Sequence, residues 1–405
     1  MRKTLFIIFW LPVFIPVFAQ RNYTSTSVLS GGNWFKIAVK ETGIYKVDVA
    51  FLNNLGITNP VSSSGIRLFG NGGQMLPENN AAARPDDLLE NAILISDGGD
   101  GVLNGNDFFL FYSPGPDRWI KDSANKKFVH QKNLYSNESF YFITVAGTGK
   151  RILPSVNFPS ANVSINSFDE RYFHELDTVN FLSSGKEWYG EEFSNSPGRV
   201  TSRSFTVNLP GIQVSQPVTV TTDVIGRSIG AFSRFDVRLN NVLLYQHNIP
   251  PLTGGSFDAV AVPSAQAFET VLTQPALSLD LVYSPGSVNG QGWLNWFEIL
   301  CKRNLSLQNT NQLLFRDWNS VATGNVGEFI IQNATASTQV WDVTNPSDAA
   351  VMNSNIAGGE LRFRNDCSRL REYVAFNGNG FFTPVGKGRV NNQNLHQPQL
   401  AQMLI

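Results

Sequence analysis

The stretch FDVRLNNVLLYQ, residues 235–246, decides the fold class of this chain. Two runs rich in aromatic, β-branched and aliphatic residues, 235–239 and 242–246, flank Asn240 and Asn241. Asparagine tolerates the positive φ angles that a two-residue hairpin turn requires. The stretch therefore predicts two antiparallel strands joined by a tight turn.

Similar strand patterns recur along the whole chain, separated by Gly, Asn, Asp and Pro. Residues 34–39 and 44–49 flank a Glu-Thr-Gly turn and predict a second hairpin, whereas only residues 49–55 show a short helical pattern. Further strands are expected at 66–69, 92–95, 107–112, 140–145, 204–209, 218–224, 276–283, 293–300, 312–315, 328–331, 338–343, 360–363 and 372–376. The sequence thus predicts an all-β protein with two or three β-sandwich or jelly-roll-like domains in series.

The length of 405 residues fits several domains behind an export signal. Arg2 and Lys3 precede an apolar run that ends at Ala19, which is typical of a signal peptide and too short for a membrane span. The expected divisions are a signal peptide at 1–19, a β-rich domain at 20–165, a jelly-roll-like sandwich at 166–303, a small β domain at 304–390, and a linker with the start of a truncated domain at 391–405.

The last residues, 400–405, form an apolar stretch that resembles the opening of a buried strand. Chain termini are usually polar and frayed unless packing holds them. We therefore expect residues 391–405 to begin a further domain that is cut short.

Charge balance restricts the partners of this protein. The chain has 31 basic and 32 acidic residues, for a formal net charge of −1. Nucleic-acid-binding surfaces usually show a large, segregated positive excess. We therefore expect no nucleic-acid partner.

Candidates for catalysis are few. Of the four histidines, His174 is the most suggestive, because Glu175 and Asp177 follow it, although adjacent strand residues point to opposite faces. A structural histidine is the favoured interpretation. Residues 184–193 place three carboxylates around two aromatic residues, a composition found in sugar-binding and glycosidase sites but more often in a solvated turn.

A loop rich in Asp, Asn and Gly is the best metal candidate. Asp97, Asp100, Asn104 and Asp107 offer oxygen ligands of the kind that Ca²⁺ prefers. The spacing does not fit an EF-hand, and turn chemistry explains the same residues equally well. Calcium is the only cofactor that the residues suggest.

The two cysteines, Cys301 and Cys367, are too few for a disulfide scaffold. A single disulfide between them and two buried thiols are both possible, and buried thiols are favoured by the habits of free cysteine. Lys302 and Arg303 follow Cys301 and would stabilise a thiolate there. The residues themselves assign no catalytic role.

Eight runs, taken in order, resemble one family. They are WFKIAVKETGIYKVD (34–48), IRLFGNGGQMLPE (66–78), DDLLENAILI (86–95), GNDFFLFYSPGPDRW (105–119), RYFHELD (171–177), SGKEWYGEEF (184–193), QVWDVTNP (339–346) and REYVAFN (371–377). The set is similar to the gingipain-like cysteine peptidases that act as sortases of the bacterial type IX secretion system. Gly70, Gly72 and Gly73 in the second run would permit a turn that a β-carbon blocks.

This resemblance implies β-rich N-terminal modules followed by a caspase-like α/β peptidase domain with a His–Cys dyad. The family removes C-terminal sorting domains from exported cargo and attaches the cargo to lipopolysaccharide at the outer-membrane surface. Neither His396 nor Cys367 matches the dyad, so the resemblance implies a non-catalytic region that scaffolds or docks. It also implies outer-membrane secretion components and cargo C-terminal domains as partners, and a location between the periplasm and the cell surface.

An alternative class of function is a free-standing exported adhesin or carbohydrate-binding sandwich. Trp188, Trp293 and Trp296 could form a platform on which sugar rings stack, although buried aromatic residues are commoner. A third hypothesis is residual peptidase activity through Cys301 or Cys367.

Overall fold

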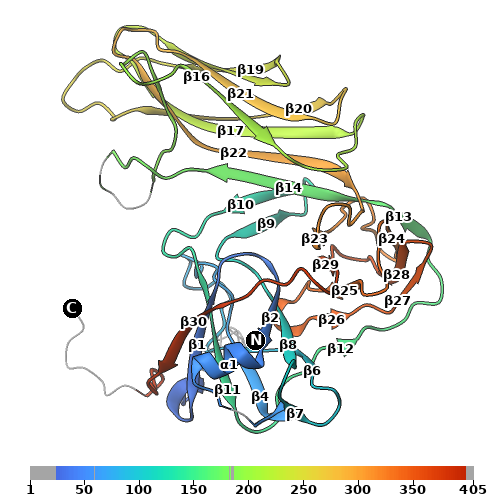
Figure 1. Cartoon of the computed structure of the whole chain (residues 1–405). Coiled ribbons are helices and arrows are strands. Elements are labelled where there is room, and N and C mark those ends of the chain that lie inside the picture. Colours follow the sequence, from blue (N-terminus) through green and yellow to red (C-terminus); the bar gives the residue numbers. More distant parts are fainter. Residues whose placement is uncertain (1–23, 59, 182, 184–186, 398–405) are drawn as a thin grey trace, which may run out of the picture.

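The computed structural model describes residues 24–58, 60–181, 183 and 187–397. The regular secondary structure of this part of the chain is almost all strand, in several sheets, which confirms the all-β, multi-domain prediction. The predicted signal peptide and the apolar stretch 400–405 lie outside the described residues. In Figure 1 a long-stranded sandwich lies above two smaller β regions, with a short hairpin between them.

The N-terminal region is a small sandwich around one apolar core, which includes Ile37, Val47, Ile66 and Phe109. The helix α1 (Val49–Leu55) begins where Asp48 accepts a hydrogen bond from the Phe51 N–H and ends at the left-handed Gly56. One sheet has the order β30 (Val385–Val390), β1 (Trp34–Val39), β11 (Ser139–Val145), β4 (Ile66–Phe69), β5 (Glu90–Asn91). The others are β2 (Gly43–Asp48), β8 (Phe108–Ser113), β6 (Leu94–Ser96), and the pair β3 (Val61–Ser62) and β7 (Val102–Leu103).

The hairpin predicted for residues 34–49 is wrong, although both strands exist. β1 lies between β11 and β30, whereas β2 pairs with β8 in the other sheet. Both edges of β1 are therefore already hydrogen-bonded. Ile37 and Tyr45 face the same core from opposite sheets, so the turn between the strands is a corner of the sandwich.

Residues 166–304 form a jelly-roll-like sandwich, the upper part of Figure 1. Its hairpin at Asn240 and Asn241 is confirmed, with φ angles of 50° and 67°. One sheet has the order β14 (Ser167–Glu175), β22 (Gln291–Asn304), β17 (Pro217–Arg227), β20 (Val262–Val271), with β15 (Glu192–Ser194) also on β22. The facing sheet has the order β16 (Ser202–Val207), β21 (Leu277–Ser284), β18 (Ser233–Leu239), β19 (Val242–Ile249).

The third region consists of two sheets that enclose a core including Phe315, Phe329, Phe363 and Tyr373. One sheet has the order β12 (Leu153–Pro154), β26 (Ala350–Val351), β25 (Gln339–Asp342), β29 (Tyr373–Phe376), β23 (Gln312–Phe315). The other has the order β13 (Val163–Ile165), β24 (Val326–Ile331), β28 (Glu360–Asp366), β27 (Ser354–Ala357). The 3-10 turns are η1 (Val28–Ser30), η2 (Ser63–Gly65) and η3 (Pro346–Asp348).

Strands cross the predicted domain boundaries in two places. β12 and β13, which precede the predicted boundary at residue 165, pair in parallel with strands of the third region. β30, which was grouped with the third region, pairs with β1 of the N-terminal sheet. The regions are therefore joined by shared strands as well as by surface contacts.

A two-stranded hairpin made of β9 (Arg118–Asp122) and β10 (Lys127–Gln131) lies between the regions. Its Phe128 packs against Trp318 and Leu370 of the third region. Its His130 stacks on Phe173 of β14 with ring centroids 3.6 Å apart. The hairpin thus contacts both the jelly roll and the third region.

Candidate functional site

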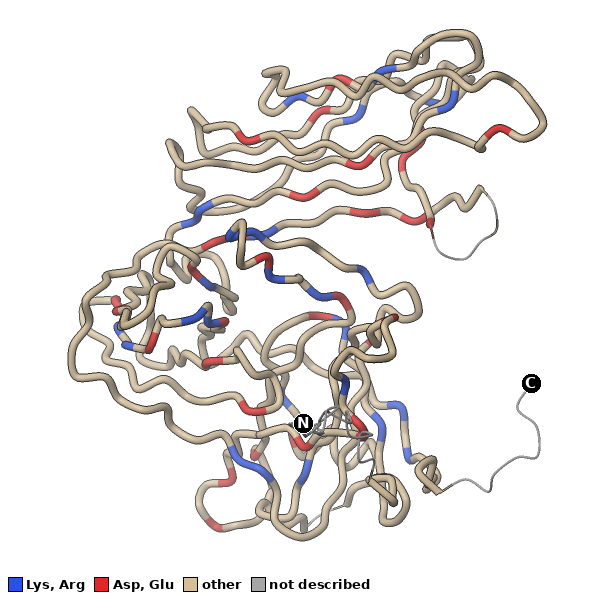
Figure 2. The backbone as a smooth tube through the Cα atoms, turned by 180° about the vertical axis from the view of Figure 1, so that it is seen from behind, with Lys and Arg blue, Asp and Glu red and all other residues tan. Residues whose placement is uncertain are grey.

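Four charged side chains from three regions meet at the centre of the molecule. Glu372, just before β29, pairs with Arg316 at 2.9 Å, with Arg171 of β14 at 3.2 Å and with Lys121 of β9 at 3.6 Å. Figure 2 shows charged residues of both signs on the strands where the upper sandwich meets the rest of the chain. One carboxylate therefore connects the hairpin, the jelly roll and the third region.

Burial and neighbouring charges shift the pKa values of Glu372 and Arg171. Burial by itself would raise the pKa of Glu372, but Arg316, Arg171 and Lys121 outweigh it and lower the pKa to about 2. Burial and the neighbouring Arg316 lower the pKa of Arg171 to about 10, against the pull of Glu372. Glu372 and Arg171 are therefore both charged at neutral pH.

A cavity of about 410 Å³ lies beside the cluster. Its wall comes from the hairpin, the N-terminal region, β14 and the third region. It is lined by Thr42, Gln74, Tyr112, Pro114, Asp117, Arg118, Trp119, Ile120, Lys121, Arg171, Val343, Thr344, Pro346 and Glu372. This junction cavity, so defined, is the candidate functional site.

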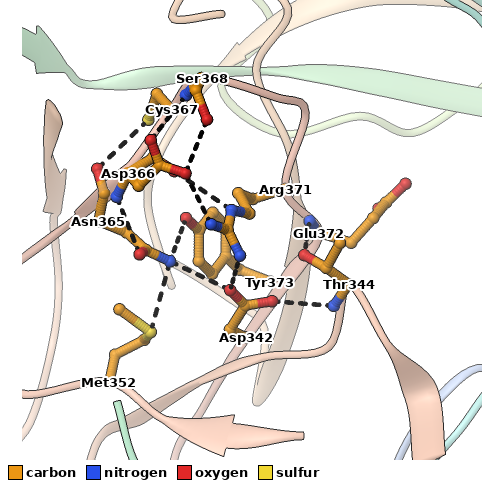
Figure 3. Close-up of polar contacts among 10 residues, drawn as sticks. All are labelled: Asp342, Thr344, Met352, Asn365, Asp366, Cys367, Ser368, Arg371, Glu372 and Tyr373. Atoms are coloured by element: carbon orange, nitrogen blue, oxygen red, sulfur yellow. Dashed lines mark hydrogen bonds and ion pairs between the residues drawn. The ribbon is translucent and has the colours of Figure 1, made fainter. Parts of the chain in front are cut away.

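A second polar network supports the cavity from the third region (Figure 3). Arg371 lies between Asp366, at 2.8 Å, and Asp342, at 3.4 Å. Asn365 donates to Asp342 and to the Tyr373 hydroxyl, and Thr344 Oγ1 accepts from the Glu372 N–H at 3.0 Å. These contacts fix the backbone that carries Thr344 and Glu372.

The hairpin is also held on the jelly roll by polar contacts. The His130 N–H donates to Glu298 at 2.7 Å, and Lys132 pairs with Glu175 and Asp177. Burial and Asp177 raise the pKa of Glu175 to about 7, although Lys132 opposes the shift. Glu175, which follows His174 in the sequence, therefore attaches the hairpin to the jelly roll through Lys132.

His174 has a different partner from those the sequence suggested. Its Nε2 lies 2.8 Å from Glu191, and its ring stacks on Phe297 with centroids 5.0 Å apart. Glu191 belongs to the predicted solvated turn, but its side chain is only 11% exposed. The solvated-turn interpretation is wrong for Glu191, because it pairs with a histidine inside the sandwich.

The cysteines lie in separate cores. Cys301 and Cys367 are both free and buried, the first in the jelly roll and the second in the third region. Burial raises the pKa of Cys301 to about 12. Lys302 pairs with Asp169 at 2.8 Å, and Arg303 pairs with Glu170. The Arg303 charge lowers the pKa of Cys301, but burial outweighs it. The described residues therefore contain no activated cysteine.

The candidate calcium loop uses its side chains within its own turns. Asp97 accepts from the Gly99 N–H, Asp100 from the Val102 N–H, and Asp107 from the Asn104 N–H. Within residues 24–397, masked positions aside, no three His, Cys, Asp or Glu side chains form a metal-binding group. Calcium stays a prediction without geometric support.

The three tryptophans of the proposed sugar platform differ in exposure. Trp293 is 3% exposed and packs on Phe181, whereas Trp188 is 41% exposed. Trp296 packs on Phe173 at 6.0 Å. A buried Trp293 cannot stack on a sugar, so the platform as predicted does not exist.

Six of the eight quoted runs contribute to the junction cavity, each with at least one lining residue. Thr42, Gln74, Tyr112 and Arg171 come from four of them, and Thr344 and Glu372 come from the last two. Lys121 and Arg316 lie outside all eight runs, and no local pattern marked them. Only their place in the fold reveals their part in the site.

No described helix is long and apolar enough to cross a membrane. Comparison with known proteins finds no matching family model. It also finds no matching curated protein.

The solved structures that match include one with a high TM-score over most of this chain. Dimeric latent PorU from Porphyromonas gingivalis superposes with a TM-score of 0.77 at 23% identity, over 93% of this chain and 35% of that one. This chain thus spans about a third of the length of that protein.

A carbohydrate-binding module (CBM6) of the laminarinase LamC from Zobellia galactanivorans also matches, at 16% identity over 33% of this chain and 98% of the module. Its TM-score of 0.19 is too low to support an argument. The match to PorU shows that the described chain has the fold of part of that protein, as the ordered runs predicted.

Proposed function

We propose that this chain is the N-terminal, non-catalytic region of a type IX secretion system sortase. The sortase as a whole is a surface cysteine peptidase that removes C-terminal sorting domains from exported cargo and attaches the cargo to lipopolysaccharide. The observation that carries the proposal is the fold match to PorU over 93% of this chain. The convergence of six quoted runs on one cavity adds support, because unrelated local similarities would not gather in space.

A scaffolding role fits the chemistry of the described residues. Glu372, Arg171, Arg316 and Lys121 connect three regions by charge pairs that are mostly removed from solvent. Buried charge pairs of this kind fix relative orientation, since each member is costly to leave alone. Both thiols are buried in apolar cores, where they lack the electropositive, accessible setting of a nucleophile.

The proposed setting is the periplasm and the outer-membrane surface, reached through the predicted signal peptide at residues 1–19. The proposed partners are outer-membrane secretion components and cargo C-terminal domains. The net charge of −1 is the reason for proposing no nucleic-acid partner.

Deletion of the gene in the organism that encodes it tests this function. We expect cargo to keep its C-terminal sorting domains and to lose its attachment to lipopolysaccharide. A plasmid copy should restore both, whereas a copy carrying Glu372→Gln should restore them less well. Normal cargo processing and attachment in the deletion strain would overturn the proposal.

A further inference from the structure

The junction cavity has features of a ligand site that a purely structural junction does not need. A volume of about 410 Å³ stays open between regions that otherwise pack closely. Its wall combines a phenol, an indole, three cationic side chains and two carboxylates. Pockets that bind small molecules have this kind of mixed lining, with apolar walls and a few convergent polar groups.

Tyr112 is the first specific indication of a ligand. The residue is only 7% exposed, and it lines the cavity beside Arg171 and Glu372. Burial raises the pKa of Tyr112, so the phenol keeps its proton and can donate a hydrogen bond.

The charges around Tyr112 favour a negatively charged ligand. Arg118, Lys121 and Arg171 line the cavity, and Arg316 lies directly behind Glu372. The two acids on the wall are already engaged. Asp117 accepts from the Asn133 N–H at 2.8 Å, and Glu372 is held by Arg316 and Arg171.

Lys121 is the cation best placed for a ligand. Its Nζ lies 3.6 Å from Glu372, near the outer limit of an ion pair, and its side chain is 35% exposed. It therefore retains the freedom to contact a second anion. Three cations against two carboxylates on the wall also leave a positive excess that such an anion would offset.

We propose that the junction cavity binds a small oxyanion, a carboxylate or phosphate group, through the Tyr112 hydroxyl and the Lys121 ammonium. The Trp119 ring provides an apolar wall for the part of the ligand that carries the anion. Because the wall comes from the hairpin, the N-terminal region, β14 and the third region, the bound anion holds these regions together. The proposal stands independently of a role in a sortase.

Titration of the purified protein with sodium phosphate and with sodium acetate, at ionic strength held constant with NaCl, tests the proposal. We expect a saturable rise in Tm with at least one of the two, since a ligand that binds only the folded state stabilises it. A response to phosphate alone or acetate alone identifies the preferred oxyanion. Calorimetric titration of the same anion gives its dissociation constant.

The variants Tyr112→Phe and Lys121→Met should each weaken binding about tenfold or more, because each removes a hydrogen bond to a charged group. The matched controls are Tyr135→Phe, at a tyrosine that is 87% exposed, and Lys126→Met, at an exposed turn outside the cavity. Circular dichroism shows whether each variant is folded. No rise in Tm with either anion, or an equal rise in Tyr112→Phe and the unaltered protein, overturns the proposal.

Discussion

Arg316 donates through its Nε to the carboxylate of Glu372 across 2.9 Å, with a side chain that is only 2% exposed. A guanidinium buried to this extent has almost no access to water. Its charge is balanced by Glu372 and by a hydrogen bond to the Asp169 carbonyl oxygen. The buried charge of Arg316 in the third region therefore depends mainly on the carboxylate of Glu372.

Glu372→Gln should destabilise the protein by about 3–5 kcal/mol, because it leaves Arg316 and Arg171 buried without a counter-charge. The free energy of urea unfolding, monitored by tryptophan fluorescence, measures the effect. Glu360→Gln is the control, since Glu360 forms a surface ion pair with Arg362. Equal urea midpoints for the two variants would contradict the importance of the cluster.

Glu175 should make the protein less stable as the pH rises. Its folded pKa of about 7 lies above the ordinary value of 4.5, so the folded state binds the proton more tightly. This contribution is complete below pH 4.5 and is lost as the pH rises through 7. Glu175→Gln should reduce the fall in urea midpoint between pH 5 and pH 7.5, and Asp348→Asn, at an exposed ion pair, should not.

His247 should act in the opposite sense. It is fully buried between Thr222 and Ser264, at 2.8 Å from each, and burial lowers its pKa to about 4. Because the unfolded state binds the proton more readily, stability falls as the pH drops from 6.5 through 4. We expect His247→Asn to lower stability at pH 7 while flattening its pH dependence between 7 and 4.5. A slope unchanged from that of the original protein would rule out this assignment.

Gly73→Ala should cost about 1–3 kcal/mol through overpacking. A β-carbon there would lie 2.1 Å from Ser139 Oγ and 2.7 Å from the Pro116 Cα. The matched control is Gly31→Ala, where no atom lies within 4 Å of the added carbon. Thermal unfolding of the two variants should separate them clearly, and similar midpoints would contradict the close approach.

Neither thiol should react in the folded protein. Cys301 and Cys367 are buried, and burial raises the pKa of both. A thiol reagent such as Ellman's reagent should label the protein only after addition of guanidinium chloride, and then at two sites. Fast labelling of Cys301 under native conditions, lost in Cys301→Ala, would support the residual peptidase hypothesis instead.

Elements with strong local signals could be predicted from the sequence. The helix at 49–55 was expected from its short helical pattern and has the expected bounds, with Asp48 and Gly56 as its caps in the structure. The hairpin of β18 and β19 was also predicted, because two adjacent asparagines tolerate the positive φ angles of its turn. The reasoning about glycine also holds, since a β-carbon at Gly70 would lie 2.4 Å from the Tyr141 ring.

Strands that lie between the regions could not be predicted. β14 and the hairpin of β9 and β10 carry charges without clean apolar alternation, because they lie between regions. These are the elements that supply Arg171 and Lys121 to the junction. Arg171 and Glu372 are 201 positions apart, and nothing local brings them together.

The pairing of β30 with β1 has a consequence for the order in which the chain folds. β1 begins at residue 34 and β30 ends at residue 390, so the N-terminal sheet gains its outer strand only after the chain up to residue 390 is available. Contacts of such long sequence separation form late and slowly. During synthesis or export, one edge of β1 therefore stays unpaired until β30 is available. A chain that ends before β30 would leave this edge open to pairing with other chains.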